Sequence, residues 1–357
     1  MAVRFTVVLA AALTFSGCRC AASNAALAPH ELAAIRGALV YVNEASGTAQ
    51  VNRFLADGGS QALTAGPRSH FPLGAWRGGL VIAASEGEAD QHLEQPLWLA
   101  PDGGSVPLQP QSRRARAMVL TRELDALLLE SGLEGFSEIV RVDLQGATRL
   151  TSNPEGNFEP QALPGGDVLF VSSRDGNPNL FRAAADGGAQ QRLTDDAAED
   201  LSPRVSPDGA SVAFISTRRG FDEIFLMPST GGSARPLLKE PLPAGPKQPT
   251  PREAVQRDVS FSADGKTIWF TGRSGAGRLR VWRADVATGA ATALTDGTAD
   301  DDQPKLSADG RWLAWVSTRD GNAELYVSRA DGSGVTRLTH DPTADWLPVW
   351  RQLTESP

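Results

Sequence analysis

The sequence predicts an all-β fold, a seven-bladed β-propeller, with a six-bladed propeller as the alternative count. Three observations carry this prediction. A Leu-Thr pair, or a near variant, recurs every 42–45 residues, with one longer interval of 56 residues that contains a Pro-rich insertion. Asp-Gly and Gly-Gly pairs separate short β-rich runs between these tags, as hairpin turns do. The two ends of the chain also carry complementary parts of one repeat. The tags lie at Leu63-Thr64, Leu108, Leu150-Thr151, Leu193-Thr194, Leu238, Leu294-Thr295 and Leu338-Thr339.

The last regular repeat shows how one blade is built. It contains four β-rich runs separated by three turns, and four short antiparallel strands in about 40–45 residues are typical of one propeller blade. Residues 65–151 follow this order less clearly, and the six-bladed alternative arises there. The strands of the last repeat are expected at 303–307, 312–317, 324–327 and 335–339, and its turns at 308–310, 319–322 and 330–334.

The two ends of the chain are predicted to close the ring. Residues 345–350 are typical of a first strand with no second strand after it. Residues 38–64 supply strands two to four of a blade without a first strand. Pairing these segments completes one blade and removes an open strand edge, which otherwise invites aggregation.

The repeated residues resemble a known family. Residues 203–209 have the pattern Pro-x-x-Ser-x-Asp-Gly, and residues 171–177 and 316–322 have the pattern Val-Ser-x-Arg-Asp-Gly-Asn. With the Leu-Thr tag, these patterns are similar to the WD-like repeat of TolB-type propellers, over residues 38–353. The resemblance implies a propeller that binds a protein or peptide in the cell envelope. The α/β domain that precedes the propeller in TolB has no expected counterpart here.

Residues 1–17 are predicted to be a lipoprotein signal peptide. Arg4 supplies a positive charge, and residues 5–15 form an apolar run that is shorter than the roughly 20 residues of a membrane-spanning helix. Residues 15–18, Phe-Ser-Gly-Cys, resemble a bacterial lipobox with Phe in place of the usual Leu. The resemblance implies a lipid anchor on Cys18, in the outer membrane facing the periplasm. A signal peptide cleaved near residues 21–22 is the alternative.

Residues 18–36 are expected to form a tether with one helical turn at 31–36, and residues 37–357 the propeller domain. The 357-residue chain has a net charge of −8 and no long basic run, which argues against nucleic acid as a partner. Its two cysteines are Cys18 and Cys20, so the folded body is expected to have no disulfide and no Cys-based metal site. We expect a monomer without a resident cofactor.

An acidic arc is predicted where the inner strands begin, on the face that carries the loops from strand two to strand three. Two less regular repeats carry basic residues at the corresponding place. A funnel of this kind would hold a cation such as Ca²⁺ through oxygen ligands, or a basic peptide segment. Alternatively, the acids satisfy loop amides or pair with the repeated arginines Arg174, Arg218, Arg273 and Arg319. The arc comprises Asn157, Glu159, Asp200, Asp301, Asp302 and Asp345, and the basic side comprises Arg68, His70, Arg113, Arg114 and Arg116.

The sequence therefore predicts a non-catalytic, lipid-anchored scaffold that binds an envelope protein or peptide on this face. A metal-dependent enzyme of lactonase or lyase type and a glycan-binding module are the rival functions. The enzyme is the weaker interpretation because neither a histidine-rich cluster nor a single acid–base cluster is evident. The Pro-rich insertion at 239–252 is either a docking strip on the same face or a drifted loop.

Overall fold

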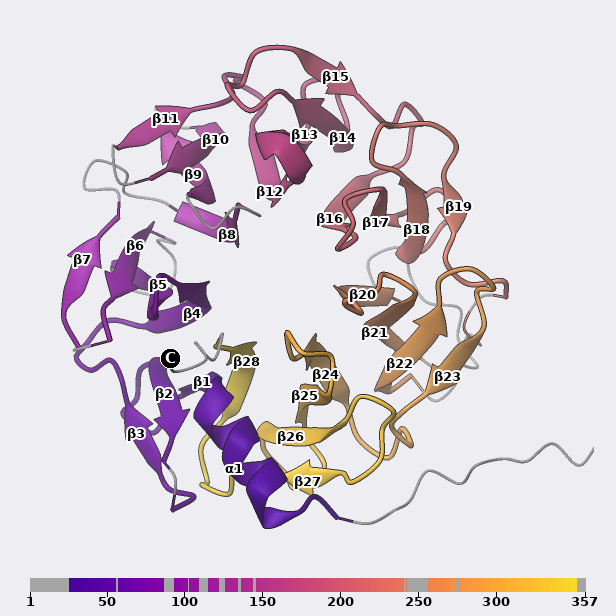
Figure 1. Cartoon of the computed structure of the whole chain (residues 1–357). Helices are drawn as coiled ribbons and strands as arrows, with labels where there is room; N and C mark the ends of the chain where they lie inside the picture. The colour runs from indigo at the N-terminus through magenta and orange to yellow at the C-terminus, as the bar shows by residue number, and fades with distance from the viewer. Residues whose placement is uncertain are drawn as a thin grey trace, which may run out of the picture.

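The computed structural model describes residues 26–351, apart from 56, 87–92, 102, 109–114, 122–125, 134–135, 144–145, 241, 243–255 and 274–276. Within these limits the chain forms seven four-stranded antiparallel sheets, arranged as blades around a central axis (Figure 1). The seven-bladed prediction is confirmed. The six-bladed count is wrong, because residues 65–151 contribute two complete blades. The signal peptide, Cys18, Arg113, Arg114 and most of the Pro-rich insertion lie outside the described residues.

The blades follow one another in chain order, except that blade 1 joins the two ends. Blade 1 consists of β28 (Asp345–Trp350), β1 (Leu39–Asn43), β2 (Gln50–Phe54) and β3 (Ser60–Ala62). Blade 2 consists of β4 (His70–Trp76), β5 (Gly79–Glu86), β6 (Leu93–Leu99) and β7 (Ser105–Pro107). Blade 3 consists of β8 (Ala115–Leu120), β9 (Leu127–Leu133), β10 (Phe136–Val142) and β11 (Ala147–Arg149).

The four regular repeats form the other half of the ring. Blade 4 consists of β12 (Asn157–Ala162), β13 (Val168–Ser172), β14 (Asn179–Ala183) and β15 (Gln190–Arg192). Blade 5 consists of β16 (Asp200–Val205), β17 (Ser211–Ser216), β18 (Glu223–Pro228) and β19 (Arg235–Pro236). Blade 6 consists of β20 (Gln256–Phe261), β21 (Thr267–Arg273), β22 (Leu279–Asp285) and β23 (Ala291–Ala293). Blade 7 consists of β24 (Asp301–Leu306), β25 (Trp312–Ser317), β26 (Glu324–Arg329) and β27 (Thr336–Arg337).

Ring closure follows the predicted pairing. Strand β28 runs antiparallel to β1, with Leu39 opposite Trp350 and Asn43 opposite Asp345. Figure 1 shows β28, in yellow, beside β1, in indigo, in this blade. The last strand therefore occupies the innermost place of a blade whose other three strands come from the start of the propeller.

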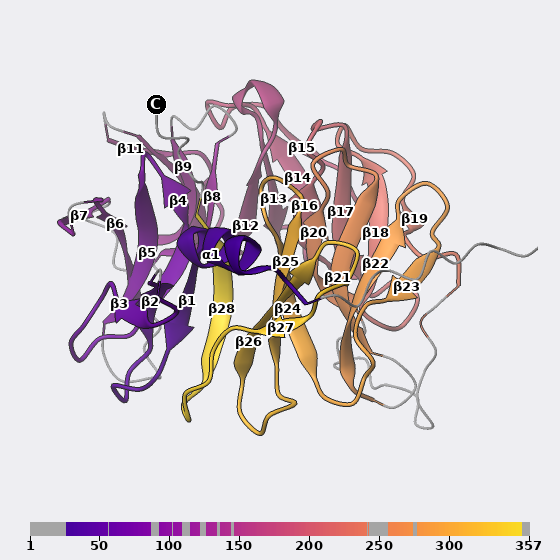
Figure 2. The same cartoon turned by 60° about the horizontal axis from the view of Figure 1, so that its bottom comes forward.

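Helix α1 (Pro29–Ala38) packs against the propeller, whereas the sequence predicted a tether with a single helical turn. Pro29 at its first position suits a helix start, and the Glu31 carboxylate accepts a hydrogen bond from the Ala28 amide at 2.7 Å. Ile35 is fully buried in the cluster that joins blades 7 and 1, and Glu31 forms an ion pair with Arg329 at 2.8 Å. Figure 2 shows the helix lying across the outside of the ring.

The Leu-Thr tag recurs because the threonine, which follows the outer strand of a blade, forms hydrogen bonds with the third strand of the same blade. Thr339 Oγ1 accepts the backbone N–H of Leu325 at 2.9 Å and donates to the Glu324 carboxylate at 2.6 Å. The leucine before it, Leu338, is buried. Thr194 makes the same backbone contact in blade 4, where its hydroxyl accepts the N–H of Leu180 at 3.0 Å.

The Ser-x-Asp-Gly turns are stabilised from within. In blade 5, Ser206 Oγ donates to Asp208 Oδ1 at 2.5 Å and accepts the N–H of Ser211 at 2.9 Å. Gly209 follows with a φ of 75°, in the left-handed region that favours glycine. A side chain there would also collide with Pro164 of the neighbouring blade. The same hydrogen bonds recur at Ser262 and Ser307.

The core lies largely between the blades, as expected for a propeller. Between blades 6 and 7, for example, Trp269 and Val281 pack with Leu313, Trp315 and Tyr326 in one buried cluster. Each inner strand begins on one face of the ring, called here the entry face, and ends on the opposite exit face. The loops from strand two to strand three also lie on the entry face, because neighbouring strands are antiparallel.

Candidate functional site

The first residue of each regular inner strand is polar and fully buried on the entry face. Asp200 in blade 5 and Asp301 in blade 7 have no exposed surface, and neither does Asn157 in blade 4. Each contacts an arginine from the turn between the second and third strands of its own blade. Arg218 Nη2 lies 2.9 Å from Asp200 Oδ1, and Arg319 Nη2 lies 2.9 Å from Asp301 Oδ1.

These arginines are the ones in the repeated Ser-x-Arg segment. Arg319 Nε donates to Ser317 Oγ at 2.9 Å, and its guanidinium carbon stands 4.5 Å from the centre of the Tyr326 ring. Arg218 has the same contacts, with Ser216 and with the ring of Phe225. In blade 4 the arginine contacts an amide, since Arg174 Nη2 donates to Asn157 Oδ1 at 2.9 Å.

The structure thus places Asn157, Asp200 and Asp301 in buried contacts with repeated arginines. This is the arrangement that the alternative interpretation of the acidic arc predicted. Their side chains are not presented to solvent at the entry face.

Asp345 in blade 1 departs from this pattern. The turn that follows β1 has the sequence Asn43-Glu44-Ala45, so Ala45 stands where the regular blades have arginine. Asn43 Nδ2 donates to Asp345 Oδ1 at 2.8 Å, while Asp345 Oδ2 is buried without a hydrogen-bond partner. Burial raises the pKa of Asp345 to about 7, and the nearby Asp341 carboxylate adds to the rise.

Glu159 lies two residues further along its inner strand than Asn157, at the β-bulge. Glu159, Ser202, Asp258, Gln303 and Leu347 occupy this position in five blades, all with φ near 50°. The Glu159 side chain reaches the next blade, where Oε2 accepts the N–H of Ser202 at 2.5 Å. Gln303 Oε1 contacts the N–H of Leu347 in the same way at 3.0 Å. These side chains therefore join neighbouring inner strands.

Asp302 and Asp258 form a carboxylate pair on blades 7 and 6. Arg257 holds both, with an ion pair from Nη2 to Asp302 and another from Nε to Asp258 at 3.3 Å. Burial raises the pKa of Asp258, and the neighbouring Asp302 raises it further.

Two cations face the same region from the inner strands. Arg204 on β16 follows Pro203, and Lys305 on β24 follows Pro304 at the same position of its blade. Burial is the main cause that lowers the pKa of each group, and Arg204 lowers that of Lys305 further, while the nearby carboxylates of the cluster act in the opposite direction. Within the described part of the chain, neither side chain has an ion-pair partner closer than 4.0 Å. Arg204, Lys305, Asp258, Asp302 and Glu159 are called here the axial cluster.

The sequence did not single out Arg204, Lys305 or Asp258. The residues predicted from the sequence lie at or near loops, whereas these three lie within strands. Their position in the repeat was the available signal, because the residue after the repeated proline is polar or charged in blades 4, 5 and 7, as Gln161, Arg204 and Lys305.

The predicted basic side is described only in part. Arg68 is exposed on the loop before β4, and its carbonyl accepts a hydrogen bond from Gln50 at 2.8 Å. His70 is buried at the start of β4, where Nδ1 lies 3.1 Å from Gln50 Oε1, and burial lowers its pKa. Arg116 lies on β8, and nothing further is described of its side chain.

The described residues contain neither a metal-binding group of side chains nor a membrane-spanning helix. No three His, Cys, Asp or Glu side chains within them are grouped as a metal ion would require. None of the helices in this part of the chain has the length and apolar character that a membrane crossing needs.

The fold and the buried Arg–Asp contacts define a seven-bladed propeller of WD-like repeats. A family model described as the TolB beta propeller domain matches residues 134–302. An uncharacterized protein of Agrobacterium fabrum is 30% identical over 216 residues, which are 59% of this chain and 68% of that protein. A TolB homologue of Chlorobium luteolum is 28% identical over 174 residues, which are 48% of this chain and 36% of that protein. The chain belongs to the TolB-type β-propeller family.

Solved structures show the same fold. TolB from Acinetobacter baumannii matches 94% of this chain and 89% of its own, with a TM-score of 0.54 and 20% identity. A puromycin-hydrolyzing peptidase of Mycobacterium tuberculosis matches 88% of this chain and 55% of its own, with a TM-score of 0.62 and 19% identity. An oligogalacturonate lyase of Vibrio parahaemolyticus matches 81% and 85%, with a TM-score of 0.60 and 10% identity. The fold is therefore shared by proteins with quite different functions.

Proposed function

We propose that this chain is a non-catalytic binding propeller of the cell envelope, and that its axial cluster receives an acidic segment of a partner protein. The observation that carries the proposal is the pair of cations Arg204 and Lys305. They lie on inner strands around the axis and are near enough to repel each other. Of the predicted arc, Asp200, Asp301 and Asp302 already pair with Arg218, Arg319 and Arg257 respectively. A carboxylate from a partner would relieve this repulsion.

The chemistry differs from what the sequence predicted, which was a cation or a basic segment. The difference follows from the pairing of the arc. A carboxylate that already contacts a guanidinium attracts a second cation much less strongly. Arg204 and Lys305 are the cations of the axial cluster that form no ion pair within 4.0 Å among the described residues, and an acidic segment complements them.

The test uses fluorescein-labelled peptides of ten residues, one rich in Asp and Glu and one rich in Lys and Arg, titrated with the protein while anisotropy is measured. We expect the acidic peptide to bind, and Lys305→Gln and Arg204→Gln each to weaken binding about tenfold, the effect of 1.4 kcal/mol. Lys266→Gln is the matched control, because Lys266 is exposed on a turn of blade 6. Equal binding of both peptides, or equal weakening by the control, would contradict the proposal.

We also propose that the chain is exported and anchored through a lipid on Cys18, in the outer membrane facing the periplasm. The pattern of residues 1–18 supports this. Metabolic labelling with a radioactive fatty acid should mark the wild-type protein but not Cys18→Ser. Labelling of both, or of neither, would contradict the anchor without touching the binding proposal.

A second candidate is an enzyme that uses Asp258 and Asp302 as an acid–base pair. Its support is the raised pKa of Asp258 beside Asp302 and Lys305, and the lyase among the structural neighbours. Turnover of a pectic oligosaccharide that disappears in Asp258→Asn would favour the enzyme. Absence of turnover with intact peptide binding would favour the scaffold.

A further inference from the structure

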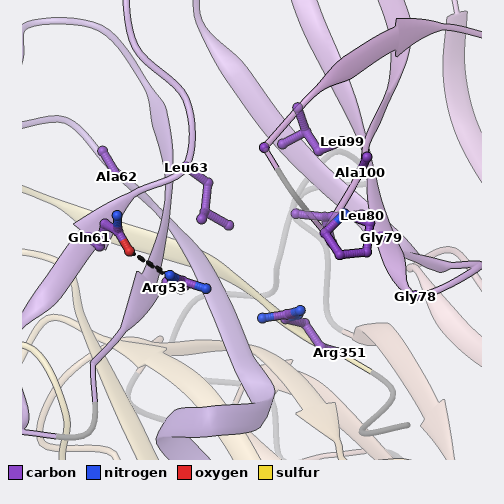
Figure 3. A pocket seen from close by; sticks show the side chains of 12 residues that line it. Arg53, Gln61, Ala62, Leu63, Gly78, Gly79, Leu80, Leu99, Ala100 and Arg351 are labelled. Carbon is purple, nitrogen blue, oxygen red and sulfur yellow. Dashed lines mark hydrogen bonds between the residues drawn. The ribbon is translucent and has the colours of Figure 1, made fainter.

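A pocket lies at the seam between blades 1 and 2, on the exit face and away from the axial cluster. It is formed where β2 and β3 of blade 1 meet two turns of blade 2, the one between β4 and β5 and the one between β6 and β7. Arg351, the residue directly after the ring-closing strand β28, completes it. Figure 3 shows the pocket with its lining side chains. Its volume is about 280 Å³.

The polar part of this seam pocket consists mainly of two arginines. In Figure 3 the guanidinium groups of Arg53 and Arg351 extend into the pocket towards each other. Gln61 accepts hydrogen bonds from Arg53 Nε at 3.0 Å and Arg53 Nη2 at 2.7 Å, which orients that guanidinium. Among the described residues, the side chain of Arg351 has neither a hydrogen bond nor an ion pair.

The lining contains no described acidic residue. Two like charges that face one another raise the energy of the empty pocket, and an anion between them lowers it. A carboxylate suits two guanidinium groups because their planar N–H forks match its oxygens.

The remaining walls of the pocket are apolar. Leu63 lies above the arginines in Figure 3, and Leu80 and Leu99 stand on the side of blade 2. Pro101 also lines the pocket. The volume equals roughly nine times the share of one water molecule in the liquid, about 30 Å³. It accommodates a small molecule and excludes a folded partner.

We propose that the seam pocket binds a small organic carboxylate that carries an apolar group. Arg53 and Arg351 hold the carboxylate, and Leu63, Leu80 and Leu99 pack against the apolar part. Such a ligand contacts blade 2, the strands from the start of the propeller and the residue after its last strand. It therefore joins the segments that close the ring, and its binding stabilises the folded protein.

A second pocket, between blades 4 and 5, shows why this one is favoured. It is larger, about 510 Å³, and it also contains two arginines. There, however, Arg218 pairs with Asp196 at 2.8 Å, and Arg192 pairs with Asp175 at 3.2 Å. Its arginines are already paired with carboxylates, whereas no ion pair to Arg53 or Arg351 is found among the residues that the structure describes.

The test is calorimetric titration of the full chain with octanoate, and with octanamide as the uncharged probe of the same length. We expect octanoate to bind and octanamide to bind at least tenfold more weakly. Arg351→Gln and Arg53→Gln should each weaken octanoate binding at least tenfold. Arg311→Gln is the matched control, since Arg311 is an exposed arginine of blade 7 whose ion pair with Asp309 lies far from the seam along the chain.

A second variant tests whether binding needs the space of the pocket in addition to the charge of its arginines. Ala62 is an exposed lining residue, and Ala62→Trp should fill the pocket and abolish binding while both arginines remain. Bound octanoate should also raise the melting temperature of the wild type but not of Ala62→Trp. No binding of octanoate at millimolar concentration, or binding that persists in Ala62→Trp and Arg351→Gln, would overturn the proposal. The peptide assay at the axial cluster is independent of either result.

Discussion

The inner strands of blades 7 and 1 both begin with an aspartate, but the aspartate has different partners in the two blades. Asp301 in blade 7 and Asp345 in blade 1 are both without exposed surface. Asp301 contacts the guanidinium of Arg319, whereas the partners described for Asp345 are the neutral groups of Asn43 and Thr339 and the acidic Asp341. The repeat therefore supplies a buried carboxylate in both blades, but its counter-charge in only one.

The difference teaches what the arginine contributes. A buried carboxylate with a hydrogen-bonded cation retains its charge, whereas one with a neutral partner tends to take up a proton. The raised pKa of Asp345, about 7, follows from burial without an arginine. Blade 1 differs further because its inner strand comes from the opposite end of the chain. The carboxylate and the turn that faces it are thus far apart in sequence.

The largest effect is expected when blade 7 is made to resemble blade 1. Arg319→Ala removes the guanidinium that contacts Asp301, Ser317 and the Tyr326 ring. We expect a loss of about 3 kcal/mol in the free energy of unfolding, because a buried charge then lacks its partner. Urea unfolding at pH 7.5 measures it. The double variant Arg319→Ala/Asp301→Asn should recover part of the loss; if it recovers none, the guanidinium acts through packing and not through charge.

Neutralising Asp345 should have the next largest effect, with the opposite sign. The pKa of Asp345 is raised from 3.8 to about 7 in the folded protein. The folded state therefore holds this proton more tightly than the unfolded state, and stability from this group is full below about pH 4 and falls as the pH rises towards 7. Asp345→Asn removes the titrating group, so the loss of folding stability at high pH disappears with it.

For this variant we expect a gain of about 2 kcal/mol at pH 8, roughly half of the full shift at about 1.4 kcal/mol per pKa unit, and little change at pH 4. Melting temperatures recorded from pH 4 to pH 8 measure it. A wild-type curve that does not fall between these values would show that Asp345 is ionised throughout, as would an equal effect of the substitution at both ends.

A smaller gain should follow when blade 1 receives the residue that it lacks. Ala45 is exposed and stands at the position of Arg218 and Arg319. We expect Ala45→Arg to bring a guanidinium to Asp345 and to flatten the pH dependence, with about 1 kcal/mol gained at pH 8. Ala45→Gln is the uncharged control. If both variants flatten the curve equally, the effect is not electrostatic.

The same comparison shows which features could be predicted from the sequence. The repeats, the turns and the ring closure could be predicted because Leu-Thr, Asp-Gly and the strand at 345–350 are local sequence patterns. The burial of Asp200 and Asp301 was not visible, since it depends on how a turn folds back over the start of its own blade. Arg204, Lys305 and the seam pocket depend on neighbouring blades or on the two chain ends meeting. No spacing within a single repeat encodes them.

The smallest effect is expected for an ion pair on the same face that is not buried. Arg278 lies 3.0 Å from Asp300, but the two side chains are 52% and 38% exposed. Asp300 also accepts the backbone N–H of Leu279 at 2.8 Å, so it keeps a partner when the arginine is removed. We expect Arg278→Gln to change the free energy of unfolding by less than about 0.5 kcal/mol, because water screens exposed pairs. The measurement is urea unfolding beside Arg319→Ala under the same conditions. A loss as large as that of Arg319→Ala would show that burial does not distinguish the two pairs, and the contrast between blades 7 and 1 would then need another cause.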